Sequence, residues 1–434
     1  MDPARVLAFR VLREVELHDR YANLELSRQL RQARLPARDA AFATELVSGT
    51  LRMRAAYDAV LAQLVDRALD ADVRDALRLG THQLLGMRVS NHAAVGTTVE
   101  LVKREIGFRP SGLVNAVLRK VAGRPLDEWL ADQPLDVVTS HPRWVVDELA
   151  RALDRPGELA PLLHADNARP TVTLVARPGL ATRTELPGRP LDSSPYAVAL
   201  DGGDPGAIAA VREGRAGVQD AGSQLVALAL ARADVVGADA RWLDLCAGPG
   251  GKAALLAAVA ATRGARVLAN DRVPHRAELV RDGVRAAGAG MLGVICGDGT
   301  RPAWPAAAFD RVLLDAPCSG LGALRRRPEA RWRRRPEDLD DLVPLQERLL
   351  DGALDAVRPG GVVVYATCSP VVRETAGVVQ SVLARRSDTG IEDAPALLPE
   401  VSDARSASLA EAAQLWPHRH GTDAMFVALL RRLR

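Results

Sequence analysis

Cysteine is scarce in this chain, which argues against a cysteine-based zinc site and against a framework of disulfide bonds. Four cysteines stand among 434 residues, at positions 246, 296, 318 and 368, and no two of them form the CxxC or CxH spacing of a zinc site. We therefore expect no metal site. A framework of disulfide bonds is typical of small secreted domains, so none is expected in a chain of this size in a reducing compartment.

Long apolar runs are also missing. No stretch reaches the roughly 18 apolar residues that cross a bilayer, and the first residues form a charged amphipathic segment rather than a signal-peptide core. The content of hydrophobic residues is 48% and that of charged residues is 26%, as in an ordinary globular protein. We expect a cytoplasmic protein of two or three domains with no membrane partner.

Lysine is rare, because only three of the 57 basic residues are lysines, and the net charge is +3. A preference for arginine over lysine throughout the chain is typical of genome composition. It therefore gives little support for nucleic-acid binding. Local clustering is more informative: residues 325–335 contain seven arginines against one acid, Glu329, with Trp332 among them. A cationic segment with an aromatic ring suits a contact with RNA, and a solvated loop is the alternative.

The periodicity of apolar residues divides the chain into three parts. We predict an all-α domain over 1–128, a small α+β connecting domain over 129–215 and an α/β domain over 216–434. Apolar positions recur at helical spacing in six segments of the first part, 6–15, 42–51, 60–69, 73–85, 93–106 and 113–121. The connecting part has helical patterns ending near 153 and 164, and strand patterns at 171–175 and 197–200.

Strands and helices alternate in the third part, which predicts a mostly parallel sheet. The predicted strands are 242–245, 267–270, 292–295, 312–314 and 362–365. The predicted helices are 252–262, 275–287, 339–357 and 372–384. Residues 424–430 are expected to add an antiparallel strand at an edge of the sheet.

Two of the cysteines follow predicted strands. Cys318 lies in DAPCSG (315–320), and Cys368 lies in ATCSP (366–370). In an open α/β sheet the ligand crevice lies beyond the carboxyl ends of the strands, so both thiols are expected at that crevice. For Cys296, a small buried hydrophobe is the simpler interpretation.

A glycine-rich segment, LDLCAGPGGK (243–252), lies between a predicted strand and a predicted helix. It lacks the GxGxxG pattern of dinucleotide sites, and Ala253 stands where a P-loop needs Ser or Thr. Acids follow successive strands at Asp271, Asp298 and Asp315. Any single Asp can be a cap or a turn residue, but three acids around one glycine loop favour an adenosine-containing ligand.

These motifs resemble those of the S-adenosylmethionine-dependent RNA cytosine-5 methyltransferases. The matching segments are 244–252, 315–320 and 366–369, together with VQDAGS (218–223) and HGTDAMF (420–426). The all-α part, including NAVLR (115–119), is similar to the RNA-binding domain of the antitermination factor NusB. The whole chain is similar to bacterial 16S rRNA methyltransferases of the RsmB (Sun/Fmu) type. Gly248 and Gly222 stand where the family often has alanine, and neither change removes a functional group.

The resemblance implies a fold, a cofactor and a partner. The fold is a Rossmann-like class I methyltransferase domain with a mostly parallel sheet, preceded by the NusB-like domain and the connecting domain. The cofactor is S-adenosylmethionine, and the partner is small-subunit ribosomal RNA, bound by a monomer.

The resemblance also implies roles for individual residues. Carbon 5 of cytosine is a weak nucleophile, so a thiolate must first add to carbon 6. The resemblance implies that Cys368 supplies this thiolate. Cys318 then assists removal of the carbon-5 proton, Asp315 holds the cytosine, and Lys252 favours the thiolate. The cofactor residues carried over are Cys246, Ala247, Gly248, Pro249, Gly250, Gly251, Lys252, Asp271, Asp298 and Asp315, with Arg276 as a further candidate.

Several alternatives stay open at this point. DNA cytosine methyltransferases carry their nucleophile in a Pro-Cys segment similar to that of Cys318, which would exchange the two thiol roles. The same reaction could act on tRNA or on another rRNA site. The NusB resemblance alone would also fit a non-catalytic RNA-binding protein, and the sheet alone would fit a nucleotide-dependent oxidoreductase.

Overall fold

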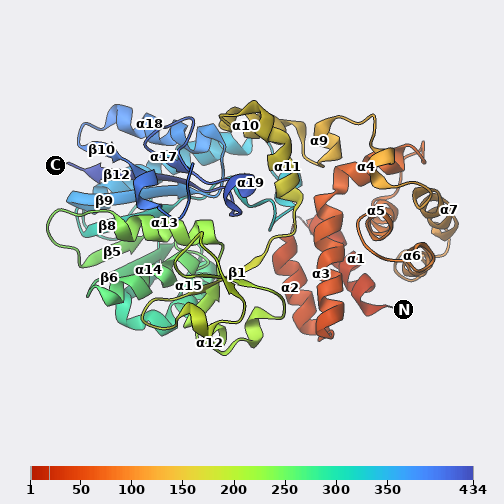
Figure 1. Ribbon diagram of the computed structural model, residues 1–434, viewed down its shortest axis with the longest axis horizontal. Coiled ribbons are helices and arrows are strands. Elements are labelled where there is room, and N and C mark those ends of the chain that lie inside the picture. The colour runs from red at the N-terminus through yellow and green to blue at the C-terminus, as the bar shows by residue number, and fades with distance from the viewer. Residues whose placement is uncertain (1, 19, 434) are drawn as a thin grey trace. The chain divides into compact units, whose positions relative to one another are not determined.

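The computed structural model describes residues 2–18 and 20–433. They form two compact units (Figure 1). The helical unit comprises the described residues up to Val146 together with Asp166–Ala168 and Leu324–Arg333, and the α/β unit comprises Asp147–Ala165, Arg169–Ala323 and Arg334–Arg434. The three-domain division expected from the sequence stays a prediction.

The helical unit is built from amphipathic helices around one apolar core. Its helices are α1 Pro3–His18, α2 Ala22–Ala33, α3 Ala37–Arg52, α4 Arg54–Ala62, α5 Ala71–Leu85, α6 Asn91–Glu105, α7 Ser111–Val121, α8 Leu126–Trp129 and α9 Leu135–Val138. In α1 the buried positions Leu7, Val11 and Val15 recur every four residues and pack into this core. The all-α prediction for this part of the chain is confirmed.

Part of the arginine-rich segment belongs to the helical unit. Within it, α16 (Ala330–Arg333) carries Arg331, which is fully buried and donates hydrogen bonds to Ser140 O at 3.0 Å and Asn167 Oδ1 at 2.8 Å. Trp332 donates from Nε1 to Leu51 O at 2.9 Å. Arg327, by contrast, is exposed. The segment is therefore not a uniformly solvated loop, and Arg331 serves the packing of the helical unit.

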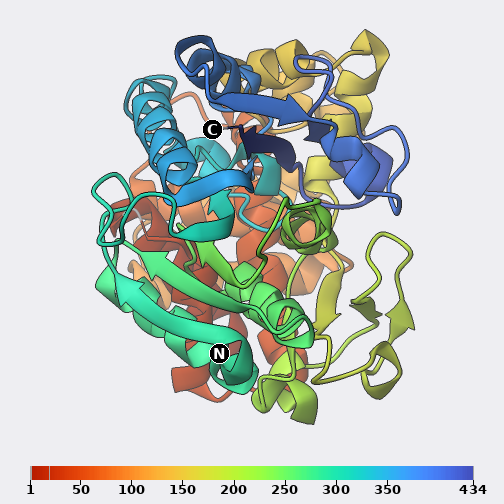
Figure 2. The same ribbon diagram turned by 90° about the vertical axis from the view of Figure 1, so that its left-hand side faces the viewer.

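A small antiparallel sheet follows the first helices of the connecting region. The strands of this sheet are β1 Val172–Ala176, β2 Arg189–Pro190, β3 Ala197–Leu200 and β4 Ala216–Val218, in the order β2-β3-β1-β4. The helices of the connecting region are α10 Arg143–Ala152, α11 Leu159–Asn167 and α12 Ala209–Arg212. In Figure 2 its yellow-green strands lie beside the larger sheet. Gln224 in helix α13 (Ala221–Arg232) donates to Leu174 O of β1, which ties the small sheet to the α/β layers.

The large sheet has the order β10-β12-β9-β8-β5-β6-β7, with β11 paired to β12. Its strands are β5 Arg241–Asp244, β6 Arg266–Asp271, β7 Met291–Cys296, β8 Phe309–Asp315, β9 Val357–Thr367, β10 Thr389–Glu392, β11 Ala413–Gln414 and β12 Phe426–Arg432. Strands β7, β6, β5, β8 and β9 are parallel neighbours, as expected. The predicted last strand is antiparallel, but it lies between β9 and β10 instead of at the edge, because the short β10 covers it.

Alternating side chains of the strands fill two apolar layers. Val312 and Leu314 of β8 pack with α17 (Asp338–Ala356) and α18 (Ala376–Arg385), whereas Leu313 packs with α13 and α14 (Gly251–Thr262). Figure 1 shows α17 and α18 above the strands, with α13 and α14 level with β8, β5 and β6. Because side chains alternate between the two covered faces, apolar residues stand at the consecutive positions 312–314 of this buried parallel strand.

Two predicted helices differ from the observed ones. The prediction of 275–287 is too long, because α15 (Pro274–Gly283) ends at Gly283 and a 3₁₀ turn follows. The prediction of 372–384 is wrong at its start, because Val372–Glu374 forms a 3₁₀ turn and Thr375, at φ −113° and ψ −102°, separates it from α18. A short helix, α19 Pro417–His420, precedes the last strand.

Candidate active site

The order of the strands brings the three sequence motifs to one edge of the sheet. Strand β8 lies between β5 and β9 in parallel register, so their carboxyl ends are neighbours. The glycine loop follows β5, the DAPCSG segment begins at the end of β8, and Cys368 directly follows β9. The predicted convergence of the glycine loop and both thiols arises from this strand order.

The two cysteines face each other. Their Sγ atoms lie 3.5 Å apart, both side chains are partly buried, and no disulfide bond joins them. The hydrogen bond to Cys368, together with burial and the nearby Glu374 and Asp315 carboxylates, raises the pKa of Cys318 well above its ordinary value. These contributions favour the protonated form of Cys318, and either sulfur can be the donor in its contact with Cys368.

Lys252 and Asp315 form an ion pair beside the thiols. Lys252 Nζ donates to Asp315 Oδ2 at 2.9 Å, and the two side chains are 12% and 26% exposed. Burial favours the neutral amine, but the charge of Asp315 and its hydrogen bond outweigh burial and raise the pKa of Lys252. Lys252 is consequently a fixed positive charge at the site.

The side chains of Asp271 and Arg276 fix the backbone of the glycine loop at Gly248. Gly248 N donates to Asp271 Oδ2 at 2.9 Å, and Arg276 donates to Gly248 O. A Cβ on Gly248 would lie 2.4 Å from Asp271 Oδ2, and Gly250 has a φ of +111° that suits glycine only. Helix α14 begins at the next residue. Asp271 thus positions the loop, in addition to any contact that it makes with a ligand.

Two side chains close to this loop are buried without hydrogen-bond partners among the described residues. Neither carboxylate oxygen of Asp244 nor either polar atom of the Gln219 amide has one. Burial first, and then the charge of Asp315, raises the pKa of Asp244 to about 8. Gln219 lies 3.7 Å from the place where a Cβ on Gly251 would be. Buried polar groups of this kind need a partner, such as a water molecule or a ligand.

The sequence analysis did not include Asp244 or Gln219 among its site residues, although it quoted the segments that contain them. Asp244 is the last residue of its strand, in the same position that Asp271 and Asp315 have in theirs. That shared position was the available signal. For Gln219 the available signal was its place in VQDAGS (218–223), one of the segments that resemble the family.

Other candidates lie differently from the expectation. Asp298 Oδ1 accepts from the backbone N and the hydroxyl of Thr300, and these bonds lower its pKa, so the side chain at least caps its own turn. Cys296 is exposed, so the prediction of a buried hydrophobe is wrong there, because this residue ends β7, which lies at the edge of the sheet. Burial and neighbouring carboxylates strongly raise the pKa of Cys246, which is a poor nucleophile.

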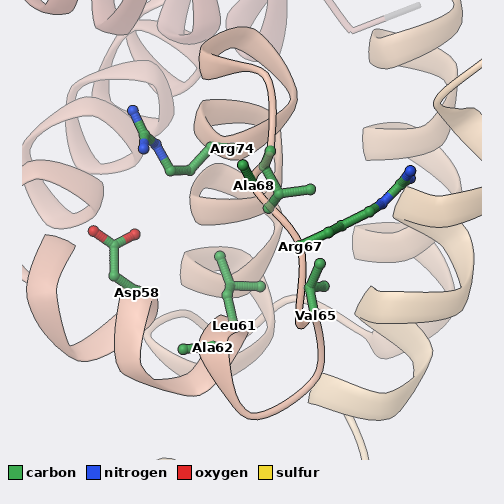
Figure 3. Close-up of a pocket in the computed structure, with 8 residues that line it drawn as sticks. Asp58, Leu61, Ala62, Val65, Arg67, Ala68 and Arg74 are labelled. Atoms are coloured by element: carbon green, nitrogen blue, oxygen red, sulfur yellow. The ribbon is translucent and has the colours of Figure 1, made fainter.

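A cavity of about 320 Å³ lies in the helical unit and is separate from these motifs. Figure 3 shows it between α4, the following loop and α5. It is lined by Asp58, Leu61, Ala62, Val65, Arg67, Ala68, Leu69 and Arg74. No cysteine and no residue of the glycine loop lines it.

Two features are not found within residues 2–18 and 20–433. No group of three or more His, Cys, Asp or Glu side chains there is arranged to hold a metal ion. No helix in the same residues has both the length and the apolar character to cross a membrane.

Comparison with known proteins agrees with the geometry of the site. The family model described as 16S rRNA methyltransferase RsmB/F matches residues 233–431, and that of the NusB family matches residues 2–123. Ribosomal RNA small subunit methyltransferase B of Sodalis glossinidius is 34% identical over 396 residues, covering 87% of each chain. The chain belongs to the RsmB/F methyltransferase family. It is therefore a methyltransferase with a NusB-like helical region at its N-terminus.

Two further likenesses extend over the whole chain. Rv1407 of Mycobacterium tuberculosis, which carries a methyltransferase name, is 50% identical over 453 residues and covers 100% of this chain and 97% of its own. The crystal structure of PH0851 is 21% identical, with a TM-score of 0.79, and covers 99% of this chain and 98% of that one. The likeness to PH0851 shows that the fold is shared, and the α/β unit has the class I methyltransferase fold expected from the sequence.

Proposed function

We propose that the protein transfers a methyl group from S-adenosylmethionine to carbon 5 of a cytosine in 16S ribosomal RNA, through a covalent bond between Cys368 and the base. The observation that carries this proposal is the pair of thiols 3.5 Å apart beside the Lys252–Asp315 ion pair. Most methyl transfers need no thiol at all, whereas attack on a cytosine ring needs a nucleophile for carbon 6 and a base for carbon 5.

The residues around the glycine loop fit S-adenosylmethionine. This ligand carries a cationic sulfonium and a cationic amino group, and the buried Asp244 carboxyl, whose pKa is raised to about 8 without a ligand, can ionise beside a cation. Glycine at 248 lets Asp271 approach the loop backbone, and glycine at 250 permits the φ of +111° that leads the loop into α14. We assign cofactor binding to residues 246–252, Asp244, Asp271, Asp298 and Asp315. When bound, S-adenosylmethionine supplies the methyl group.

Cys368 begins the reaction as a thiolate. Its sulfur forms a bond to carbon 6 of the cytosine, and the electron pair of the C5–C6 double bond moves toward carbon 5, which can then accept the methyl group. The positive charge of Lys252 favours the thiolate. Asp315, held by Lys252, lies directly before the Cys318 loop and is placed to bind the N3 and amino edge of the base.

Cys318 completes the reaction as the base. The hydrogen bond to Cys368 is the largest cause of its raised pKa, and that bond is weakened once the Cys368 sulfur is bonded to carbon. Cys318 then ionises more readily and takes the proton from carbon 5. The electron pair of that C–H bond restores the C5–C6 double bond and expels Cys368 as a thiolate, so the enzyme is regenerated.

The helical unit presents a surface that suits RNA. Phe108, in the turn between α6 and α7, is 77% exposed, and Lys103 Nζ lies 5.7 Å from the centre of its ring. The other exposed basic residues of these two helices and their turn are Arg104, Arg109, Arg119 and Lys120. An exposed aromatic ring among cations can stack on an unpaired base while the cations contact phosphates.

The test uses wild type, Cys318→Ala and Cys368→Ala with unmodified 16S rRNA and methyl-labelled S-adenosylmethionine. Label in RNA and denaturation-resistant protein–RNA adduct are both measured. We expect Cys318→Ala to accumulate adduct, because expulsion of Cys368 is blocked, and Cys368→Ala to give neither adduct nor label. Nuclease digestion of labelled RNA should give 5-methylcytosine.

Other outcomes would change or overturn the proposal. The reverse pattern in the two variants would exchange the thiol roles, and label that persists in both would exclude covalent catalysis by this pair. A parallel reaction with tRNA identifies the substrate, since stronger labelling of tRNA than of 16S rRNA would contradict the assignment to the small subunit.

A further inference from the structure

Glu374 is a buried carboxylate at the base of the two cysteine loops. It ends the 3₁₀ turn Val372–Glu374 that precedes α18, and its side chain is completely buried. Tyr365 of β9 donates from its hydroxyl to Glu374 O at 2.6 Å, which fixes the backbone of this turn against the sheet. A carboxylate that is completely buried requires several hydrogen-bond donors.

The donors to Glu374 come from both cysteine loops. Ser319, the residue after Cys318, donates from N to Oε1 at 2.7 Å and from Oγ to Oε2 at 2.5 Å. Ser369, the residue after Cys368, donates from Oγ to Oε2 at 2.6 Å. The two serine Oγ atoms lie 3.0 Å apart. One carboxylate therefore joins the residues that directly follow the two thiols.

Gln346 of α17 completes the arrangement. Its Nε2 donates to Glu374 Oε1 at 3.1 Å. It also donates at 2.9 Å to the carbonyl oxygen of Pro317, which is the residue before Cys318. The Cys318 loop is thus held on both sides of its thiol by groups that meet at Glu374. Strand pairing ends at Asp315 and Ala366. Beyond it, Gly322 N also donates to Cys368 O at 2.9 Å, and Glu374 adds the side-chain contacts to the residue that follows each thiol.

We propose that Glu374 is a positioning residue for the paired thiols: its carboxylate, acting through Ser319 and Ser369, holds Cys318 and Cys368 at the separation that nucleophile and base require. This inference rests on the proposed function for its catalytic consequence, although the spacing of the thiols can be measured separately. The negative charge of Glu374 also contributes to the raised pKa of Cys318, which keeps the proton on that thiol before the base is bound.

The spacing is tested with phenylarsine oxide, whose trivalent arsenic bonds to two thiols at once. Two S–H groups and the arsenic oxide give two As–S bonds and one water, with no change of oxidation state. We expect wild type to bind one arsenical per chain, and Glu374→Gln to release it at an ethanedithiol concentration at least about tenfold lower, because the thiols are no longer preorganised. Cys318→Ala should not form the dithiol complex.

A matched variant separates positioning from general damage. Glu347→Gln makes the same chemical change on α17. Glu347 pairs with Arg385 at 3.5 Å, and Arg385 belongs to neither cysteine loop. This variant should bind the arsenical like wild type. Ser319→Ala and Ser369→Ala remove single bonds to Glu374, and their effects should be far from additive with that of Glu374→Gln, because all three act through one carboxylate.

The activity of the same variants links the spacing to catalysis. We expect Glu374→Gln to lower kcat for RNA methylation by about a hundredfold while KM for RNA changes little, because the loss falls on groups that act at the reacting base. If Glu374→Gln does not fold, the serine variants carry the same test with smaller effects.

Each outcome decides one of the two proposals. Unchanged arsenical release in Glu374→Gln and in both serine variants would overturn the positioning role, even with cytosine methylation established. Unchanged kcat in Glu374→Gln would do so as well. If wild type forms no cytosine adduct but the arsenical results hold, the positioning role stands and the proposed reaction fails.

Discussion

Lys252 and Asp315 join the glycine loop to the Cys318 loop through a hydrogen bond of 2.9 Å. Lys252 comes at the end of the glycine loop that follows β5, and Asp315 ends β8. Because β5 and β8 are parallel neighbours, the pair links two adjacent strands of the sheet. A lysine that interacts with both a carboxylate and the nucleophile has an electrostatic role in the proposed reaction. Its loss should affect folding and catalysis differently.

We expect Lys252→Met to lower the methylation rate by at least about a hundredfold, since the thiolate of Cys368 loses its nearby cation. Stability should fall by about 1–2 kcal/mol, less than for a fully buried pair because both side chains retain some exposure. Lys252→Met/Asp315→Asn should regain stability without regaining activity. Arg285→Met, which breaks the exposed pair with Asp282, serves as the control for both measurements.

The four thiols should react with N-ethylmaleimide in a definite order. Cys296 is exposed and should react first. Cys368 should precede Cys318, because the raised pKa of Cys318 keeps that thiol protonated. Cys246 should react only after denaturation, since burial strongly raises its pKa. Peptide mass mapping over time checks this order, and early labelling of Cys246 in native protein would contradict it.

Asp244 should make stability depend on pH. Its pKa is raised to about 8 in the folded protein, so the folded state binds a proton there that the unfolded state releases above about pH 4. Its contribution to stability is therefore largest below pH 4 and declines as the pH rises to 8. We expect Asp244→Asn to raise Tm relative to wild type at pH 8 and to leave it nearly unchanged at pH 4.

The same carboxyl should lose its proton when a cationic ligand binds. Calorimetric titration of wild type with S-adenosylmethionine at pH 7, in buffers of different ionisation enthalpy, should show proton release. Asp244→Asn should bind more weakly and show less release. Equal proton release in the two proteins would exclude Asp244 as the group that responds to the ligand.

Phe108 should contribute to RNA affinity without contributing to chemistry. Stacking of one base on an aromatic ring is worth about 1–3 kcal/mol, so Phe108→Ala should raise KM for RNA by about 5- to 100-fold and leave kcat unchanged. Arg109→Ala should reduce the salt dependence of binding by about one unit of slope. Val236→Ala, which truncates a side chain of similar exposure in the α/β unit, should change neither.

The arginine-rich segment should separate into two functional groups. Arg331→Met should lower stability by about 1–3 kcal/mol, because the buried Ser140 carbonyl and the Asn167 side chain lose their donor. Arg327→Met should leave stability within about 0.5 kcal/mol and weaken RNA binding, since Arg327 is exposed. Chemical denaturation and filter binding measure the two effects. Weakened RNA binding by a stably folded Arg331→Met would contradict this division.

Much of the fold was predictable because its signals are local. The apolar runs before Asp315 and Cys368, and the glycine turn before α14, each reflect the conformational preference of a few neighbouring residues. Parallel strands share one edge for their carboxyl ends, so three separate motifs could be placed together before any contact was known. The resemblance to the RNA methyltransferases then supplied their roles.

Other features depended on residues far apart in the chain. The edge position of β10, the exposure of Cys296 and the complete burial of Arg331 were not predictable, because each depends on which distant segment packs there. Glu374 belongs to this group. Its sequence neighbourhood predicts only a helix, whereas its role comes from Ser319 and Gln346, 55 and 28 residues away.

The amino-acid sequence by itself determined which residues can do chemistry and which strand each follows, since periodicity and turn preference act over a few residues. Only the tertiary structure decided the 3.5 Å separation of Cys318 and Cys368 and the carboxylate that joins their loops. The physical reason is that a buried charge must collect its donors from whatever the packed layers bring within reach, and that neighbourhood exists only after the sheet and helices have packed.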